Sequence, residues 1–159
     1  MSADVKFEDF SLQVEGALND AAIAYLHEAG GAIVTQTVRN SRRKSGNTAG
    51  SFQNVVDVGN YEATVGSPME NAIWEEFGTG EYAVHGDGRR GGWWVPVGGG
   101  GISPADAQRF GKKKKDKNGN IVAVFTTGKT PTRAFQSAFD SLRSALIKRA
   151  EDVFKQKMK

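Results

Sequence analysis

Apolar residues recur at steps of three and four along two long segments, one towards each end of the chain, and this spacing predicts two amphipathic helices. The first is expected to begin at Ser11, a suitable N-cap, and to end in the polar run 39–47. Glycine is a poor helix former, so we expect a kink or break near Gly30. The second helix is expected to have Thr130 as its cap and Pro131 in its first turn, and to run for about six turns. The apolar positions are Val14, Leu18, Ala21, Ala22, Tyr25, Ala29 and Ile33 in the first segment and Phe135, Phe139, Leu142, Leu146, Ala150 and Val153 in the second.

Between these segments the pattern changes to short strands joined by tight turns. Two apolar runs flank Gly59-Asn60, a pair typical of a hairpin turn. Pro68 and Gly78 frame a short helix, and Pro96 marks its own run as an edge strand. The expected elements are a hairpin over 52–58 and 61–65, a helix over 69–77, a strand over 93–97, and a second hairpin over 112–115 and 121–125.

These elements predict an α+β fold in which an antiparallel sheet is covered by the two long helices, with one short helix beside them. Residues 81–120 carry eight Lys/Arg against four Asp/Glu, and residues 98–101 are four consecutive glycines. A basic, glycine-rich segment between ordinary flanks predicts a long, flexible excursion of loop and hairpin from a compact body. With 159 residues the chain is expected to be a single domain, made of 11–80, the excursion 81–120, and 121–159.

Composition excludes several classes of protein. The chain has no cysteine, which excludes disulfides, thiol catalysis and cysteine-ligated metal sites. Its two histidines, His27 and His85, are far apart in the sequence, so a histidine-rich metal centre is not expected. No apolar run reaches the ~18–20 residues of a membrane span, and residues 1–6 lead into no apolar core of a secretory signal. We therefore expect no metal, no cofactor and no membrane contact.

Several short motifs resemble catalytic or nucleotide-binding signatures but lack the required context. Residues 86–91 match Gly-x-Gly-x-x-Gly, and residues 78–83 match its looser form, yet neither lies between a buried strand and a helix. Residues 123–130 approximate a phosphate-binding loop, but the proline that follows removes an N–H where phosphate would bind. Glu75 and Glu76 are adjacent, so on a helix they point about 100° apart and cannot form a facing acid pair. We expect no catalytic residue and no enzyme.

The excursion carries a stronger functional signal, because it interleaves cations with aromatic residues. Three interpretations stay open: rings that stack on nucleic-acid bases, hot-spot residues of a protein contact, or a solvated loop whose tryptophans cover a sheet edge. The run of lysines is typical of a charged hairpin that resists edge-to-edge aggregation. The candidate interaction residues are Arg89, Arg90, Trp93, Trp94, Lys112, Lys113, Lys114 and Lys115.

Four motifs, in chain order, resemble those of the bacteriophage tail-completion family, the head–tail joining or neck proteins of long-tailed phages. Residues 71–79, Asn-Ala-Ile-Trp-Glu-Glu-Phe-Gly-Thr, are similar to the family's Tyr-Ala-x-x-x-Glu-Phe-Gly-Thr, the most specific of the four. Residues 45–51 resemble its Thr-Gly-x-Leu-x-x-Ser, Val65-Gly66 its strand-ending pair, and residues 130–138 its proline- and phenylalanine-bearing entry to the last helix. The family's threonine, leucine and tyrosine are replaced here by Ser45, Thr48 and Asn71. The resemblance spans residues 11–157, with the excursion as an insertion.

The resemblance implies a non-enzymatic structural protein of the virion, made in the host bacterial cytoplasm, which completes the head-proximal end of the tail. Its implied partners are further copies in a homohexameric ring, the tail terminator and the head connector, with a passing contact to genomic DNA. Within the Glu-Phe-Gly-Thr box, Phe77 anchors the short helix, Gly78 allows a sharp turn before Thr79, and Glu76 either meets a basic group on a neighbouring subunit or stays solvated. Two alternatives stay open: a tail terminator or minor tail protein, and a nucleic-acid-binding protein that uses the excursion.

Overall fold

The structure is a computed structural model that describes residues 10–42 and 46–158. It confirms the α+β class, since long N- and C-terminal helices pack together and short helices and small antiparallel sheets make up the rest. The chain divides into two compact units. The helical unit comprises the chain up to Pro68 and again from Ala134, and the basic unit is Met69–Arg133.

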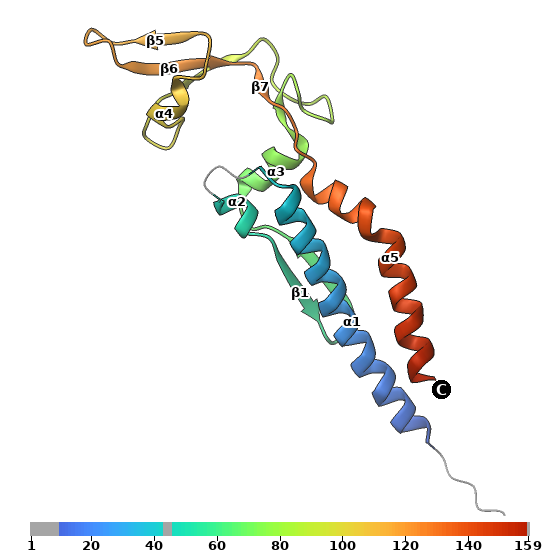
Figure 1. The fold of residues 1–159 in the computed structure, drawn as a ribbon. Helices are drawn as coiled ribbons and strands as arrows, with labels where there is room; N and C mark the ends of the chain where they lie inside the picture. Colours follow the sequence, from blue (N-terminus) through green and yellow to red (C-terminus); the bar gives the residue numbers. More distant parts are fainter. Residues whose placement is uncertain (1–9, 43–45, 159) are drawn as a thin grey trace, which may run out of the picture. The chain divides into compact units, whose positions relative to one another are not determined.

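The helical unit is built on two long helices, α1 (Ser11–Asn40) and α5 (Ala134–Lys157), which lie side by side and antiparallel (Figure 1). Most of their buried positions are small, which allows close packing of the two backbones. The Tyr25 hydroxyl on α1 donates a hydrogen bond to the Leu146 carbonyl on α5 at 2.7 Å. The buried residues are Ala21, Ala29, Gly30, Ile33 and Thr37 on α1 and Ala134 and Ala138 on α5.

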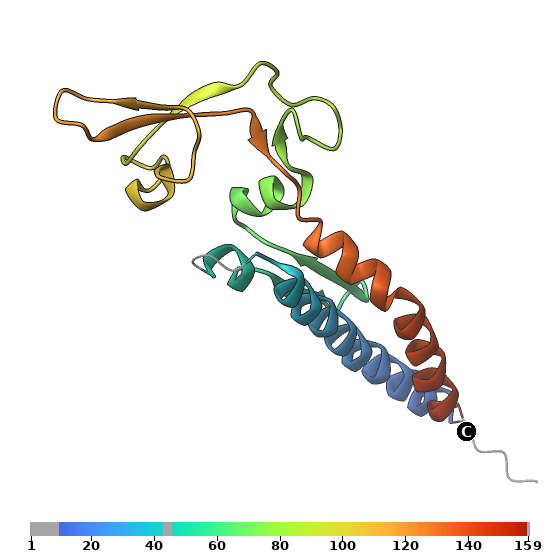
Figure 2. The ribbon, with the colours of Figure 1, turned by 45° about the horizontal axis from the view of Figure 1, so that its top comes forward.

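A β-hairpin packs against α1 in the same unit (Figure 2). Strands β1 (Gln53–Asp57) and β2 (Glu62–Gly66) pair antiparallel, as the Gly59-Asn60 pair predicts. The Asp57 carboxylate closes the turn by accepting from the backbone N–H groups of Gly59 and Asn60 at 2.9 and 3.2 Å. The bond from the Asn60 side chain, followed by these backbone bonds, lowers the pKa of Asp57.

The expected kink near Gly30 is wrong, because α1 continues unbroken through it. Asn54 of β1 lies against Gly30, and its Nδ2 donates to the Leu26 carbonyl at 3.3 Å. A Cβ at Gly30 would overlap the Asn54 side chain, whereas a Cβ at Gly31 would meet nothing within 4 Å. Glycine therefore lets the strand approach the helix here and does not bend it.

The start of α1 also differs by one position from the expectation. Ser11 is its first helical residue, and Phe10 is the N-cap, because the first backbone bonds of the helix run to the Phe10 carbonyl at 3.0 Å. A single further turn, α2 (Asn47–Gly50), precedes the hairpin. The expectations for residues 1–6 and for Ser45 lie outside the described residues.

The basic unit is a series of short elements joined by turns. Its antiparallel strands form the sheets β3–β7 and β4–β6–β5, so with the hairpin β1–β2 the strands within residues 10–42 and 46–158 fall into three small sheets and not one. The strands expected around 93–97, 112–115 and 121–125 are confirmed, and Pro96 lies at a sheet edge. Its helices are α3 (Glu70–Phe77) and α4 (Pro104–Ala107), and its strands are β3 (Thr79–Gly80), β4 (Trp93–Pro96), β5 (Lys113–Lys115), β6 (Ile121–Thr126) and β7 (Gly128–Lys129).

Charge is divided unevenly between the two units. The basic unit carries ten Lys/Arg against seven Asp/Glu, a net charge of +3, whereas the helical unit carries eleven of each. The whole net charge of the chain therefore lies within Met69–Arg133. Over the described ranges 10–42 and 46–158, no helix combines the length and the hydropathy that a bilayer crossing requires.

Candidate interaction site

The Glu-Phe-Gly-Thr box, residues 76–79, forms the turn from α3 into β3. The helix ends at Phe77, and Gly78 follows with a φ of 73°. A Cβ at Gly78 would lie 2.8 Å from the carbonyl oxygens of both Tyr82 and Lys129. Both its backbone conformation and its neighbours therefore require glycine at this position.

The other three box residues lie in different surroundings. Glu76 is buried, with 9% of its surface exposed, so the expectation that it stays solvated is wrong. Phe77 is 43% exposed, and its ring centre lies 5.2 Å from that of His85. The Thr79 hydroxyl accepts from the Lys129 N–H at 3.0 Å and so reinforces the pairing of β3 with β7.

Glu75, to which the sequence pattern assigns no role, ties α3 to β7 and to the segment that follows it. Its carboxylate pairs with the Lys129 ammonium and accepts from the Thr132 hydroxyl at 3.1 Å. Its backbone carbonyl accepts from the Thr132 N–H at 2.6 Å. Thr132 is held by these bonds outside any helix and Arg133 follows with a φ of 51°, so the helix start predicted at Thr130-Pro131 is wrong, and α5 begins at Ala134.

The sheet β4–β6–β5 has one covered face and one open face, since α4 packs against one side of it. Val124 on the covered face is fully buried, and its partner Lys113 donates to the Gln108 carbonyl at 2.7 Å. Side chains alternate between faces along a strand, so the register assigns the neighbours of these residues to the opposite side. We call this side the open face; its residues are Trp94, Pro96, Lys112, Lys114, Ala123 and Phe125.

On the open face, lysine ammonium groups lie over aromatic rings. Lys114 Nζ is 4.5 Å from the centre of the Trp94 ring, and Lys112 Nζ is 5.2 Å from that of Phe125. The two rings meet edge to face at 5.5 Å. Lys114 and Trp94 belong to the two outer strands and meet diagonally across the middle strand, where Lys114 is paired with Ala123 and Trp94 with Phe125. Cation–π attraction of this kind holds the cations in defined positions.

The hairpin that carries β5 is closed by the same device as the hairpin of the helical unit. The Asp116 carboxylate accepts from the backbone N–H groups of Asn118 and Asn120, each at 2.8 Å. The bonds from Asn120, first from its backbone and then from its side chain, are the main causes that lower the pKa of Asp116. The turn thus fixes the register that places the lysines of β5.

The remaining candidate residues do not all share the open face. The Arg89 guanidinium lies 5.5 Å from the centre of the Trp93 ring, a separate cation–aromatic pair. Lys115 is exposed beyond a register shift in β5. The predicted interaction set thus does not form one surface. It splits into the Glu-Phe-Gly-Thr turn, the Arg89 pair and the open face, and Arg90, Lys113 and Lys115 lie outside all three.

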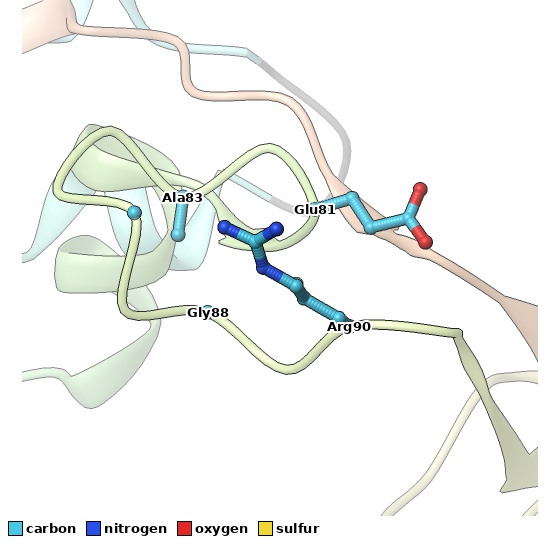
Figure 3. Close-up of a pocket in the computed structure, with 6 residues that line it drawn as sticks. Glu81, Ala83, Gly88 and Arg90 are labelled. Atoms are coloured by element: carbon cyan, nitrogen blue, oxygen red, sulfur yellow. The ribbon is translucent and has the colours of Figure 1, made fainter.

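A hollow of 310 Å³ lies within the loop that joins β3 to β4. The Arg90 side chain points into it, whereas the Glu81 carboxylate points away (Figure 3). Glu81 instead accepts from the Gly91 N–H at 3.2 Å. A helix precedes Gly78 and a strand follows Gly91, so neither glycine motif has the strand-then-helix setting of a dinucleotide site. The lining residues are Gly80, Glu81, Ala83, Gly86, Gly88 and Arg90.

Two features of the surface do not stand out in the sequence pattern. Ile73 and Trp74 are 60% and 48% exposed on α3, beside the exposed Phe77. Ala123 and Phe125 complete the open face, and the alternation of residues along 121–126 was the available signal for them. Across the part of the chain that the structure describes, no group of three or more His, Asp or Glu is placed to hold a metal ion. The arrangement is suited to binding through charge and aromatic area.

Comparison with known proteins gives no assignment. No family model matches the chain, and neither a curated protein nor a solved structure is significantly similar to it.

Proposed function

We propose that this protein is a tail-completion, head–tail joining component of the neck of a long-tailed bacteriophage. It acts without catalysis, as one of several identical subunits that close into a ring at the head-proximal end of the tail. Closed rings arise from heterologous contacts, in which one surface of a subunit meets a different surface of the next. The tail terminator and the head connector are its proposed neighbours along the particle axis.

The observation that carries the proposal is the Glu-Phe-Gly-Thr box at residues 76–79. Three other motifs that resemble those of the family accompany it, and the four occur in the same order along the chain. The box lies where a short helix turns into a strand, and Gly78 has no room for a side chain. A motif that fixes a backbone turn explains why these residue types stand in this order. The exposed aromatic residues Trp74, Phe77 and Trp94 also suit a protein that works through contacts.

The test is a nonsense mutation in the gene within its parent phage. We expect lysates of a non-suppressing host to contain filled heads and separate tails by electron microscopy. Adding the purified protein should join them into infectious particles. Complete particles formed without the protein would overturn the proposal. Gene order gives an independent check, because capsid, connector and tail genes should flank the gene.

A second candidate function is nucleic-acid binding, favoured by the ten basic residues of the basic unit and by its cation–aromatic pairs. Such binding would weaken steeply with salt, because phosphate contacts release counterions. Titration of labelled DNA at several salt concentrations measures this slope. Affinity in the micromolar range or tighter at physiological salt would favour this candidate over the neck protein.

A further inference from the structure

We propose that the open face of the β4–β6–β5 sheet is a docking surface for an acidic segment of a protein partner. The inference rests on the proposed function only in taking that partner to be another protein of the particle. The docking surface consists of an aromatic centre, Trp94 and Phe125, with the ammonium groups of Lys112 and Lys114 held over it.

Charge complementarity identifies the occupant. The net charge of +3 belongs entirely to the basic unit, so an acidic partner is drawn to this unit and not to the neutral one. The two charged side chains on the open face are those of Lys112 and Lys114. Lys113, which lies between them in the sequence, is on the covered face, where its ammonium group donates a hydrogen bond to the Gln108 carbonyl. Lys113 therefore serves an internal hydrogen bond, whereas Lys112 and Lys114 lie on the open face.

The geometry prepares these lysines for carboxylates. Each long side chain already lies over a ring, so less rotamer freedom remains to be lost when a partner binds. An ammonium group carries three N–H donors, and contact of one side with a ring leaves donors for a carboxylate. Trp94, 40% exposed, and the neighbouring Pro96 offer apolar area that the aliphatic part of an acidic segment can cover.

The same geometry favours a protein over single-stranded nucleic acid. Base recognition on such sheets requires free aromatic faces, because the bases stack on them. Here lysines of the chain itself lie over Trp94 and Phe125. To stack on a ring, a base would have to displace the lysine that would otherwise bind the phosphate of the same nucleotide. A carboxylate can bind the lysine without moving it from the ring.

The experiment measures binding of the purified full-length chain to a short fluorescein-labelled peptide of alternating Glu and Leu, by fluorescence anisotropy. The same peptide with Gln in place of Glu and a short DNA duplex serve as comparison probes. We expect the acidic peptide to bind most tightly. The double variant Lys112→Glu with Lys114→Glu should weaken its binding roughly tenfold or more, as reversal of charges in an interface does.

Two single variants are the matched controls. Lys113→Glu changes the same charge on the same strand but on the covered face, and Lys148→Glu changes it on α5. Both should leave peptide affinity within about twofold of wild type, once correction is made for the general change in net charge. Circular dichroism checks folding, and Lys112→Gln with Lys114→Gln replaces the double variant if that one does not fold.

Equal losses for the open-face variants and the controls would overturn the proposal, as would equal binding of the Gln peptide. Tighter binding of the DNA duplex, lost in the same lysine variants, would assign the face to nucleic acid instead. These outcomes are separate from the particle test. A phage that assembles without the protein refutes the neck role but leaves acidic docking intact, and failure of the peptide assay leaves head–tail joining intact.

Discussion

The two units of this chain are specified by different kinds of sequence information. The helical unit consists of a 30-residue and a 24-residue helix with a hairpin, and its buried positions recur at helical spacing. The longest element of the basic unit has eight residues, and five of its glycines between residues 78 and 92 have positive φ. Periodic burial therefore defines the first unit, and local turn geometry defines the second.

The unfolding of the two units can be followed separately within one molecule. All three tryptophans, Trp74, Trp93 and Trp94, lie in the basic unit, so tryptophan fluorescence reports on that unit alone. Far-UV circular dichroism is dominated by α1 and α5 of the helical unit. Denaturation followed by both signals separates an effect on one unit from an effect on the other.

The largest effect is expected from Gly78→Ala, with Gly86→Ala as its match. Both glycines have a φ of 73°, but a Cβ at Gly78 meets two carbonyl oxygens, and a Cβ at Gly86 meets nothing within 4 Å. Backbone strain and overpacking together should lower the free energy of unfolding by about 3–5 kcal/mol for Gly78→Ala. For Gly86→Ala, backbone strain alone should lower the free energy of unfolding by about 1–2 kcal/mol. Urea denaturation followed by tryptophan fluorescence measures both, and equal losses would contradict the crowding at Gly78.

A smaller effect, with opposite signs at adjacent positions, is expected in α1. Gly30→Ala should lower the free energy of unfolding by about 1–3 kcal/mol, because the new methyl group overlaps Asn54 of β1. Gly31→Ala should raise it by roughly 0.5–1 kcal/mol, because alanine is the better helix former and the position is open. Far-UV circular dichroism during urea denaturation tests the pair. Stabilisation by both substitutions would show that the helix and the strand are not in close contact.

Two turns, one in each unit, should show the same pH dependence. Hydrogen bonds lower the folded-state pKa of both Asp57 and Asp116 below the ordinary value of 3.8. The hydrogen bonds of each carboxylate therefore contribute fully to the free energy of unfolding at pH values above the unfolded-state pKa. This contribution is lost as the pH falls through the folded-state pKa. Asp57→Asn and Asp116→Asn should be less stable than wild type at neutral pH, and the gap should narrow in acid. Unfolding curves across an acid series, read by dichroism and fluorescence respectively, provide the measurement; a gap that widens in acid would be the opposite result.

The smallest effect is expected for Glu28→Gln. Arg149 donates to Glu28 at 2.9 and 3.2 Å and lowers its pKa, but half of each side chain is exposed. Exposed pairs contribute little and are screened by salt. The variant should melt within a few degrees of wild type, with a difference that shrinks in concentrated salt. A large loss of stability would mean that the pair links α1 to α5 more strongly than its exposure allows.

How far the sequence predicts the structure also differs between the units. The periodicity along α1 and α5 and the Gly59-Asn60 turn follow from local preferences, and they are confirmed. Two of the predictions that are wrong concern positions that contact a residue distant in the sequence. Gly30 lies within the unbroken α1, where it leaves room for Asn54 of β1, and Thr132 binds Glu75 two residues before the last helix begins.

The candidate site could be predicted only in part for the same reason. Clustering of cations and aromatics in one stretch singled out Trp94 and Lys114. The division of the lysines between two faces depends on the register of β5 with β6, which the sequence pattern alone does not reveal. Lys114 is paired with Ala123 and Trp94 with Phe125, so the contact of Lys114 with Trp94 runs diagonally over the middle strand, and the sequence pattern gives no sign of it.

The placement of Lys114 over Trp94 has a spectroscopic consequence. Protons above the plane of an indole lie in the shielding region of its ring current, so the terminal methylene resonances of this lysine will appear upfield of those of every solvated lysine. A base that stacks on Trp94 will draw the ammonium away from the ring and move these signals back, whereas a carboxylate that binds the ammonium in place will leave them upfield. The protein thus carries its own nuclear magnetic resonance probe of whether a bound molecule displaces this lysine, and it needs no added label.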